Sequence, residues 1–281
     1  MFADYAPLHP GYGQRMTTPI AVTIAGSDSS GGAGIQADLK TFSALGVYGA
    51  SVITALTAQN TTGVAAVHAV PPDFIAAQMD AVFSDLAAGA VKIGMLGDAD
   101  IVAAVAAGLD RHGQTNVVLD PVMVASSGRR LLAPDAIDAL RTELLPRARV
   151  ITPNLPEAAV LLDSDEAKDE ASMLQQARRL IALGANAVLM KGGHAGGAES
   201  ADLLVTATAS IRVTGERIAT RNTHGTGCTL SAAIAAGLAK GLGLPDALHG
   251  AKAYTTAAIA AADRLAVGGG PGPLHHFHRW W

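Results

Sequence analysis

Short apolar runs alternate with longer stretches of helical spacing along most of the chain. The first run covers residues 20–25 and ends at Gly26, and the helical pattern of residues 33–45 stops at Gly46, a residue typical of helix C-caps. The same pattern predicts further strands at residues 49–57, 90–95, 116–119, 149–152 and 187–191, a hairpin over 201–213, and helices at 73–86, 99–109, 134–145, 170–183, 226–240 and 245–265.

This alternation predicts the fold class. Strands that alternate with helices form parallel sheets covered by helices on both faces. We therefore expect a three-layer α/β fold with a mostly parallel central sheet. No linker or repeat interrupts residues 17–281, which we expect to form a single domain. Residues 1–16 contain several prolines and glycines and no periodicity, so we interpret them as an N-terminal tail that is disordered or adventitious.

Composition and charge narrow the classes of protein. Of the 281 residues, 49% are hydrophobic and 16% charged, which supports a sizeable core and argues against disorder. The net charge is −4 and no basic stripe occurs, so nucleic acid and anionic membranes are not expected partners. Cys228 is the single cysteine, which fits a reducing compartment. The chain shows neither a signal-peptide pattern nor an apolar stretch of about 18 residues, and we expect it in the cytoplasm.

Polar residues and glycines gather where the predicted strands end. These positions are Gly26-Ser27-Asp28, Gln59-Asn60, Gly94-Met95, Asp120, Asn154 and Lys191-Gly192-Gly193-His194. In open parallel sheets, ligands bind outside the carboxyl ends of the strands. The sequence therefore predicts a binding site at this edge of the sheet.

The segment Thr223-His224-Gly225-Thr226-Gly227-Cys228 leads directly into a predicted helix of small residues. The first N–H groups of a helix lack partners and lie at the positive end of its dipole, so such a turn can hold an anion. Gly225 and Gly227 let a phosphate approach the backbone, and Thr226 adds a hydroxyl. The alternative is an ordinary loop before a helix. No Walker A pattern occurs in the chain.

A second glycine-rich segment, residues 26–34, could wrap a small substrate, although Gly-Ser loops are also common for structural reasons. Gly32-Ala33-Gly34 with Ala37 fits a loose dinucleotide-binding fingerprint. The acidic residue expected about 20 positions later is missing, because residues 54–57 contain none, and a nicotinamide-dinucleotide enzyme is therefore disfavoured. Asp38, about one turn into the next helix, is by itself typical of a solvated helix start.

Three charged or polar positions and the C-terminal histidines have both functional and structural interpretations. Asn154 and Glu157 lie three residues apart and could hold Mg²⁺ through waters, or could simply begin a helix. Lys191 could reach nucleotide phosphates, or could be a surface lysine. The three histidines of residues 275–281 admit a metal site, but we prefer an aromatic cap packed on the body.

In this order, the segments resemble the ribokinase superfamily and, within it, the hydroxymethylpyrimidine/phosphomethylpyrimidine kinases of thiamine biosynthesis. The resemblance runs from about residue 20 to the C-terminus and rests on Thr23-Ile24-Ala25-Gly26-Ser27-Asp28, residues 31–40, Ala58-Gln59-Asn60, Lys92-Ile93-Gly94-Met95, Asp120-Pro121-Val122-Met123, and residues 151–157, 190–194, 222–228 and 275–281. It implies a ribokinase-like fold, a homodimer, and an ATP- and Mg²⁺-dependent kinase. That kinase would phosphorylate 4-amino-5-hydroxymethyl-2-methylpyrimidine to its monophosphate and then to its diphosphate.

The resemblance also implies roles for individual residues. Gln59 would bind the amine and a ring nitrogen of the pyrimidine, in a pocket completed by Gly26, Asp38, Met95 and Val122. The anion hole for the transferred phosphoryl group would be formed by Gly225, Thr226 and Gly227. Mg²⁺ and its waters would be ordered by Asn154, Glu157 and Asp120, and Lys191 would face the ATP phosphates.

Cys228 stands where most of the superfamily has an aspartate base. In the first transfer the nucleophile is an alcohol, which gains from a base. In the second it is a phosphate monoester, largely dianionic at pH 7, which a nearby aspartate would repel. Because a helix N-terminus can lower a thiol pKa, we hypothesise that Cys228 is a usable base for the first step that does not repel the anion of the second. The alternative is that a small cysteine merely packs there.

Two other functions stay open. A pyridoxal-type kinase of the same superfamily also acts on a flat heteroaromatic ring with a hydroxymethyl group, although Gln59 favours the pyrimidine. A non-catalytic pyrimidine-binding regulator would keep Gln59 but would not need Asn154, Glu157, Lys191 and Cys228 together.

Overall fold

The computed structural model describes residues 17–124, 131–192 and 199–281. The expected tail of residues 1–16 lies outside the described residues, as do Gly193 and His194 at the end of the lysine-glycine segment.

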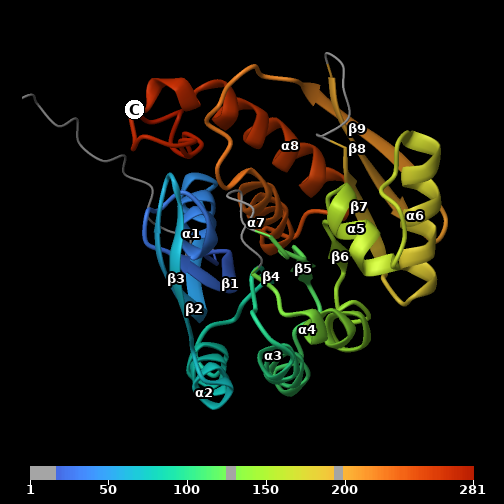
Figure 1. The fold of residues 1–281 in the computed structure, drawn as a ribbon. Helices are drawn as coiled ribbons and strands as arrows, with labels where there is room; N and C mark the ends of the chain where they lie inside the picture. Colours follow the sequence, from blue (N-terminus) through green and yellow to red (C-terminus); the bar gives the residue numbers. More distant parts are fainter. Residues whose placement is uncertain (1–16, 125–130, 193–198) are drawn as a thin grey trace, which may run out of the picture.

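A mixed sheet forms the middle layer, with the strand order β3-β2-β1-β4-β5-β6-β7-β8-β9 (Figure 1). Its strands are β1 (Ile20–Asp28), β2 (Tyr48–Asn60), β3 (Gly63–Ala69), β4 (Ala90–Ile93), β5 (Val117–Leu119), β6 (Val150–Ile151), β7 (Ala187–Lys191), β8 (Glu199–Thr206) and β9 (Ser210–Glu216). In the series β2-β1-β4-β5-β6-β7, neighbouring strands pair in parallel. The pairs β2–β3, β7–β8 and β8–β9 are antiparallel. The predicted mostly parallel sheet is confirmed.

Helices cover both faces of this sheet (Figure 1). One face packs against α1 (Gly34–Ala44), α7 (Thr226–Ala239) and α8 (Leu244–Ala260). The other packs against α2 (Pro72–Phe83), α3 (Ala99–Arg111), α4 (Pro134–Ala139), α5 (Leu155–Leu162) and α6 (Glu170–Ala182). The three-layer α/β prediction is therefore confirmed as well.

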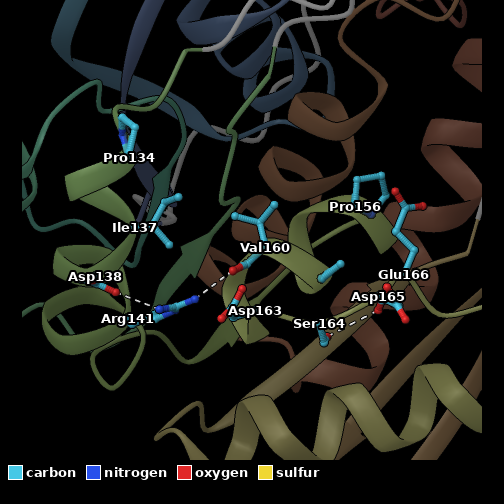
Figure 2. A pocket seen from close by; sticks show the side chains of 11 residues that line it. Pro134, Ile137, Asp138, Arg141, Pro156, Val160, Asp163, Ser164, Asp165 and Glu166 are labelled. Carbon is cyan, nitrogen blue, oxygen red and sulfur yellow. Dashed lines mark hydrogen bonds and ion pairs between the residues drawn. The ribbon is translucent and has the colours of Figure 1, made fainter.

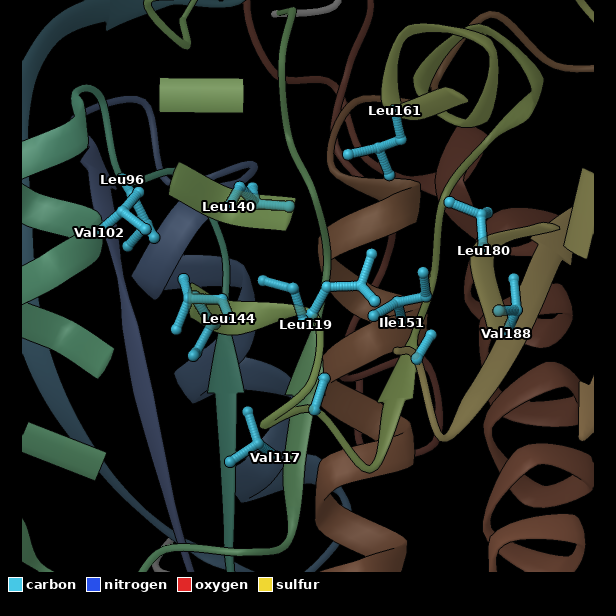
Figure 3. Packing of buried hydrophobic residues seen from close by; sticks show 14 of the residues in the cluster. Leu96, Val102, Val117, Leu119, Leu140, Leu144, Ile151, Leu161, Leu180 and Val188 are labelled. Carbon is cyan, nitrogen blue, oxygen red and sulfur yellow. The ribbon is translucent and has the colours of Figure 1, made fainter. Parts of the chain in front are cut away.

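The central strands explain why the sequence shows continuous apolar runs rather than alternation. Leu119 and Ile151 contribute to the core on the side of α2–α6, which Figure 3 shows, while their neighbours Val118 and Val150 contribute to the core against α7 and α8. Successive side chains of a strand point to opposite faces, and a parallel sheet buries both. The carboxyl ends of these strands consequently meet at one edge.

The structure corrects several predicted boundaries. β2 continues to Asn60 and turns back into β3, which the sequence did not predict; the carboxamide oxygen of Asn60 accepts from the backbone N–H of Thr62 and closes that turn. Residues 134–145 divide into α4 and a π-helical turn at Leu140–Leu144, and residues 245–265 into α8 and a 3-10 turn at Ala262–Arg264. The short helix α5 was not among the predicted helices, although a helix start at Asn154 was one of the two interpretations of that segment.

The C-terminal segment packs on α7 and α8, as we preferred. His276 Nε2 lies 3.0 Å from the Thr229 hydroxyl, and Tyr254 donates a hydrogen bond to the His276 carbonyl. The rings of His275 and Trp281 lie 4.6 Å apart. Among the described helices, none combines the length and hydropathy needed to span a membrane.

Candidate active site

A charged cluster lies at the ends of β5 and β7. Lys191 Nζ, at the last residue of β7, lies 2.9 Å from Asp120 Oδ1 and 3.7 Å from Glu157 Oε2. The Thr152 hydroxyl donates a further hydrogen bond to Asp120 at 3.0 Å. The structure thus brings together three predicted site residues from three different elements.

Burial and mutual contact shift the pKa of each group in this cluster. Burial alone would raise the pKa of Asp120, but Lys191 and Lys92 outweigh it and the pKa is lowered. Burial raises the pKa of Glu157 to about 7, with Lys191 opposing and Asp120 adding to the shift. Asp120 and Glu157 raise the pKa of Lys191 against the effect of its burial. The cluster therefore holds a permanent cation, an ionised carboxylate and a carboxyl that titrates near neutrality.

Asn154 and Glu157 form a capping box at the start of α5. The Asn154 carboxamide oxygen accepts from the Glu157 N–H at 2.8 Å, and a Glu157 oxygen accepts from the Asn154 N–H at 2.8 Å. The structural interpretation of this pair is thus confirmed. The same contacts aim Glu157 toward Lys191, so the capping box also positions a charged side chain in the cluster.

The anion turn, which is the segment of residues 223–228 predicted to hold an anion, lies beside this cluster. Gly225 caps α7 with φ +82°, and a Cβ on it would lie 2.0 Å from the Gly32 carbonyl oxygen, so only glycine fits there. A Cβ on Gly227 would lie 3.3 Å from Lys191 Nζ, which places the first turn of α7 against the lysine. The Thr226 hydroxyl donates to the Thr223 carbonyl and so braces the turn.

Most of the residues expected around the pyrimidine lie on β1 and β2 and in the loops after β4 and β5. Gln59 is the last residue but one of β2, and its amide lies 3.4 Å from His224 in the anion turn. Met95 packs on Gly26, where a Cβ would approach the Met95 methyl group to 2.5 Å. Val122 is half-buried just after Asp120, with its N–H donating to the Asp120 carbonyl. Gly26 and Met95 are therefore in contact, and Gln59 lies beside the anion turn.

Asp38 is fully buried rather than solvated, so the interpretation as an ordinary surface residue is wrong. Its Oδ2 accepts from the Thr23 hydroxyl at 2.6 Å and from Lys92 Nζ at 2.8 Å. Its Oδ1 is buried with no hydrogen-bond partner among the described residues. A buried carboxylate oxygen without a partner is the position at which a donor from a bound molecule would be accommodated.

Lys92 is the charged residue that sequence reasoning missed. It lies on β4 opposite Thr23 of β1, is fully buried, and pairs with Asp38. Burial would lower its pKa, but Asp38 and the nearby Cys228 and Asp120 raise it, so Lys92 stays charged. The available signal was a lysine inside a buried run, since lysine is almost never fully buried without a partner.

Cys228 lies in the first turn of α7, near Lys92, Asp38 and Asp120. The Gly34 N–H at the start of α1 hydrogen-bonds its thiol. Burial nevertheless raises the thiol pKa to about 11; Lys92 lowers it, and Asp38 and Asp120 raise it further. The thiol pKa is therefore raised and not lowered as we expected at a helix N-terminus, because burial outweighs that effect. The neutral thiol does fit the other half of the hypothesis, that this position does not repel an anion.

A separate groove of about 750 Å³ lies between α4 and α5 (Figure 2). Its lining includes Pro134, Ile137 and Val160. Arg141 crosses it, donating to the carbonyls of Leu161 and Val160 at the end of α5. The predicted site residues do not line this groove.

Comparisons with known proteins identify the family and the fold of the chain. The profile of the phosphomethylpyrimidine kinase family matches residues 28–275. A hydroxymethylpyrimidine/phosphomethylpyrimidine kinase of Rhizobium meliloti is 63% identical, over 94% of this chain and 99% of its own length. The ADP complex of Bacillus subtilis pyridoxal kinase superposes with a TM-score of 0.86 at 40% identity, covering 92% of this chain and 98% of that one. The phosphomethylpyrimidine kinase of Clostridium difficile 630 gives 0.76 at 44% identity, covering 85% and 99%.

Proposed function

The chain belongs to the phosphomethylpyrimidine kinase family, and from this premise we propose how its cleft carries out the reaction. The activity is that of an ATP-dependent phosphotransferase of thiamine biosynthesis, which phosphorylates hydroxymethylpyrimidine and then the phosphomethylpyrimidine. The observation that carries the proposal is the contact between the glycine turn at the start of α7 and the cluster of Lys191, Asp120 and Glu157.

The phosphoryl group would be held between Lys191 and the backbone N–H groups of Gly225, Thr226 and Gly227, and the Thr226 N–H would exchange the Thr223 carbonyl for the phosphoryl oxygen. Phosphoryl transfer depends on positioning and on stabilising charge rather than on covalent help from the protein. A fixed ammonium and a helix N-terminus supply that charge without reorganising. The packing of Gly227 against Lys191 supports a joint role for the two.

Asp120 and Glu157 fit the requirements of Mg²⁺. Both are oxygen donors near one lysine, and Mg²⁺ in kinases is usually held by one or two carboxylates, waters and substrate phosphates. Asn154 would contribute by aiming Glu157 through the capping box. When bound, the ion would neutralise phosphate charge, and Lys191 would keep Asp120 ionised to receive it.

The pyrimidine would lie against Gln59, Gly26, Met95 and Val122. Gln59 offers one donor and one acceptor to a ring edge, and Met95 offers an apolar surface. The free Oδ1 of buried Asp38 is a further acceptor for a ring substituent. This flank would present the hydroxymethyl group toward Cys228 and the anion turn.

Cys228 would act as a neutral group that tolerates both nucleophiles. We expect Cys228→Asp to slow the second transfer more than the first, because the carboxylate repels the substrate monophosphate. Each transfer is assayed separately, with Cys228→Ser as the uncharged control. If Cys228→Asp slows the second transfer no more than the first, the proposed role of Cys228 as a neutral group is wrong.

Product analysis tests the whole proposal. Adding hydroxymethylpyrimidine and Mg-ATP should release ADP, and mass analysis should show the monophosphate followed by the diphosphate. A protein that binds the pyrimidine without releasing ADP would be a regulator. The similarity to Bacillus subtilis pyridoxal kinase makes pyridoxal phosphorylation the second candidate activity, and competition between the two substrates measures it.

We also propose a homodimer and a cytoplasmic location. The first rests on superfamily analogy and the second on the single cysteine of the chain. Sedimentation of the purified protein and fractionation of cells test them separately.

A further inference from the structure

Asp28 determines which atom of His224 carries a hydrogen. Asp28 Oδ2 lies 2.8 Å from His224 Nε2, and the carboxylate also accepts from the N–H groups of Ser30 and Ala33. Burial would raise the Asp28 pKa, but the hydrogen bonds from His224 and Ser30 lower it to about 2, so the carboxylate is ionised and can only accept. The hydrogen between the two side chains therefore belongs to Nε2 of His224.

The same Nε2 faces the amide of Gln59. The structure places Gln59 Nε2 3.4 Å from it, so that two donors confront one another. Half a turn of the amide about its last bond exchanges nitrogen and oxygen without moving the rest of the side chain. The single Nε2 hydrogen points to Asp28, and after this half turn the Gln59 oxygen takes a weaker, secondary share of that hydrogen instead of opposing it with a second donor.

Thr57 favours the same orientation. Its hydroxyl lies 2.8 Å from the Ser27 carbonyl and 3.2 Å from the other end of the Gln59 amide. A hydroxyl has one hydrogen, and the carbonyl can only accept, so the hydrogen goes to Ser27. The Thr57 oxygen is then an acceptor, and the amide nitrogen of Gln59 is its matching donor.

His224 itself has little freedom to turn. It is buried, and its ring packs so closely on the backbone that a Cβ on Gly32 would lie 2.4 Å from the ring carbon Cδ2. Pro273 lies on the same spot, and the His224 N–H donates to the Gly272 carbonyl. The ring is therefore fixed with its Nε2 hydrogen directed at Asp28 and shared, more weakly, with Gln59.

We propose that His224 is a specificity-determining positioning residue, which holds the Gln59 amide in one orientation so that the cleft selects aminopyrimidines over the corresponding oxopyrimidines. The inference rests on the proposed placement of the ring against Gln59. An aminopyrimidine edge has an acceptor ring nitrogen beside a donor amine, whereas in the oxo form the ring N–H donates and the oxygen accepts. If the Gln59 amide turned freely, it could bind the edge of either the amino or the oxo pyrimidine. If it is held in one orientation, it matches only the amino form.

The test compares kcat/KM for 4-amino- and 4-oxo-5-hydroxymethyl-2-methylpyrimidine. In His224→Phe, which keeps a flat ring but loses the donor, we expect the amino-to-oxo ratio to fall about tenfold or more, the scale of one misplaced hydrogen bond. His224→Gln retains a donor at the reach of Nε2 and should recover most of the ratio. An unchanged ratio in His224→Phe, with both substrates slowed equally, would overturn the proposal.

A double-mutant cycle shows whether His224 acts through Gln59. In the Gln59→Ala background, His224→Phe should leave the ratio unchanged, and a further fall would contradict the proposal. His112→Phe is the matched control, because His112 pairs with Asp80 at 2.7 Å away from the cleft, and its ratio should equal that of the wild type.

A substitute variant, and the activity of the wild type, distinguish failure of this proposal from misfolding and from failure of the proposed function. If His224→Phe does not fold, Asp28→Asn takes its place, because losing the ionised acceptor frees the His224 tautomer and should lower the ratio in the same direction. If the wild type turns over neither pyrimidine, the proposed function fails rather than the role of His224.

Discussion

At the scale of the residue, Cys228 offers a direct chemical measurement because it is the single cysteine of the chain. Its thiol pKa is raised to about 11 by burial, with Asp38 and Asp120 adding to the shift. We therefore predict slow alkylation by iodoacetamide at pH 7 to 8, with a rate that increases up to an apparent pKa of about 11. Cys228→Ser gives the background rate. A midpoint below pH 9 would contradict a raised thiol pKa.

The buried pair of Lys92 and Asp38 makes a second prediction. Lys92→Met leaves a buried carboxylate without its cation, and should lower the free energy of unfolding by about 3–5 kcal/mol. Combining it with Asp38→Asn removes both charges and should recover most of that loss. Urea unfolding measures both variants.

The exposed pair of Arg111 and Asp80 is the control for that measurement. Both side chains are about half exposed, so Arg111→Met should change the free energy of unfolding by less than about 1 kcal/mol. Equal losses in Lys92→Met and Arg111→Met would show that burial does not strengthen the first pair.

At the scale of the element, two glycines with the same backbone requirement separate strain from function. Gly225 and Gly46 have φ of +82° and +68°, but a Cβ on Gly225 meets the Gly32 carbonyl at 2.0 Å, whereas a Cβ on Gly46 has no neighbour within 4 Å. Gly46→Ala should lose about 1–2 kcal/mol of stability through strain, and Gly225→Ala should lose more, because the clash with the Gly32 carbonyl adds to the strain.

Gly225→Ala alone should also lower kcat/KM for ATP, by about a hundredfold, because it displaces the turn that faces Lys191. Steady-state kinetics beside urea unfolding distinguish the two effects. A similar kinetic loss in Gly46→Ala would mean that general destabilisation, not the anion turn, limits the activity.

The helices and strands show which parts of the fold and of the candidate site could be predicted from the sequence. Long periodic segments such as α1 and α7 were predicted correctly, and so was the gathering of Gln59, Asp120 and Lys191 at one edge, because parallel strands end there. The start of α5 was left as one of two alternatives, because Asn154 with Glu157 also fits a magnesium pair. The pairing of Asp28 with His224 joins residues 196 positions apart and depends on how α1 and α7 pack, which no local pattern contains.

At the scale of the whole molecule, stability should depend on pH through Glu157. The folded protein holds its proton up to a pKa of about 7, against 4.5 in the unfolded chain, because the carboxyl is buried. Between these values the folded state binds more protons, so stability falls as pH rises. The contribution is fully present below pH 4.5 and is lost as the pH passes about 7.

Glu157→Gln isolates this contribution, since glutamine keeps the shape but does not titrate. From pH 5 to 8, the difference in the free energy of unfolding should shift in favour of the variant by up to roughly 3 kcal/mol, at about 1.4 kcal/mol per pH unit. Glu143→Gln, at an exposed carboxylate paired with Arg147, should run parallel to the wild type. Urea unfolding across this range measures all three proteins. Parallel curves for Glu157→Gln and the wild type would show that Lys191 keeps Glu157 ionised at neutral pH, and that both carboxylates of the cluster are already charged before a nucleotide binds.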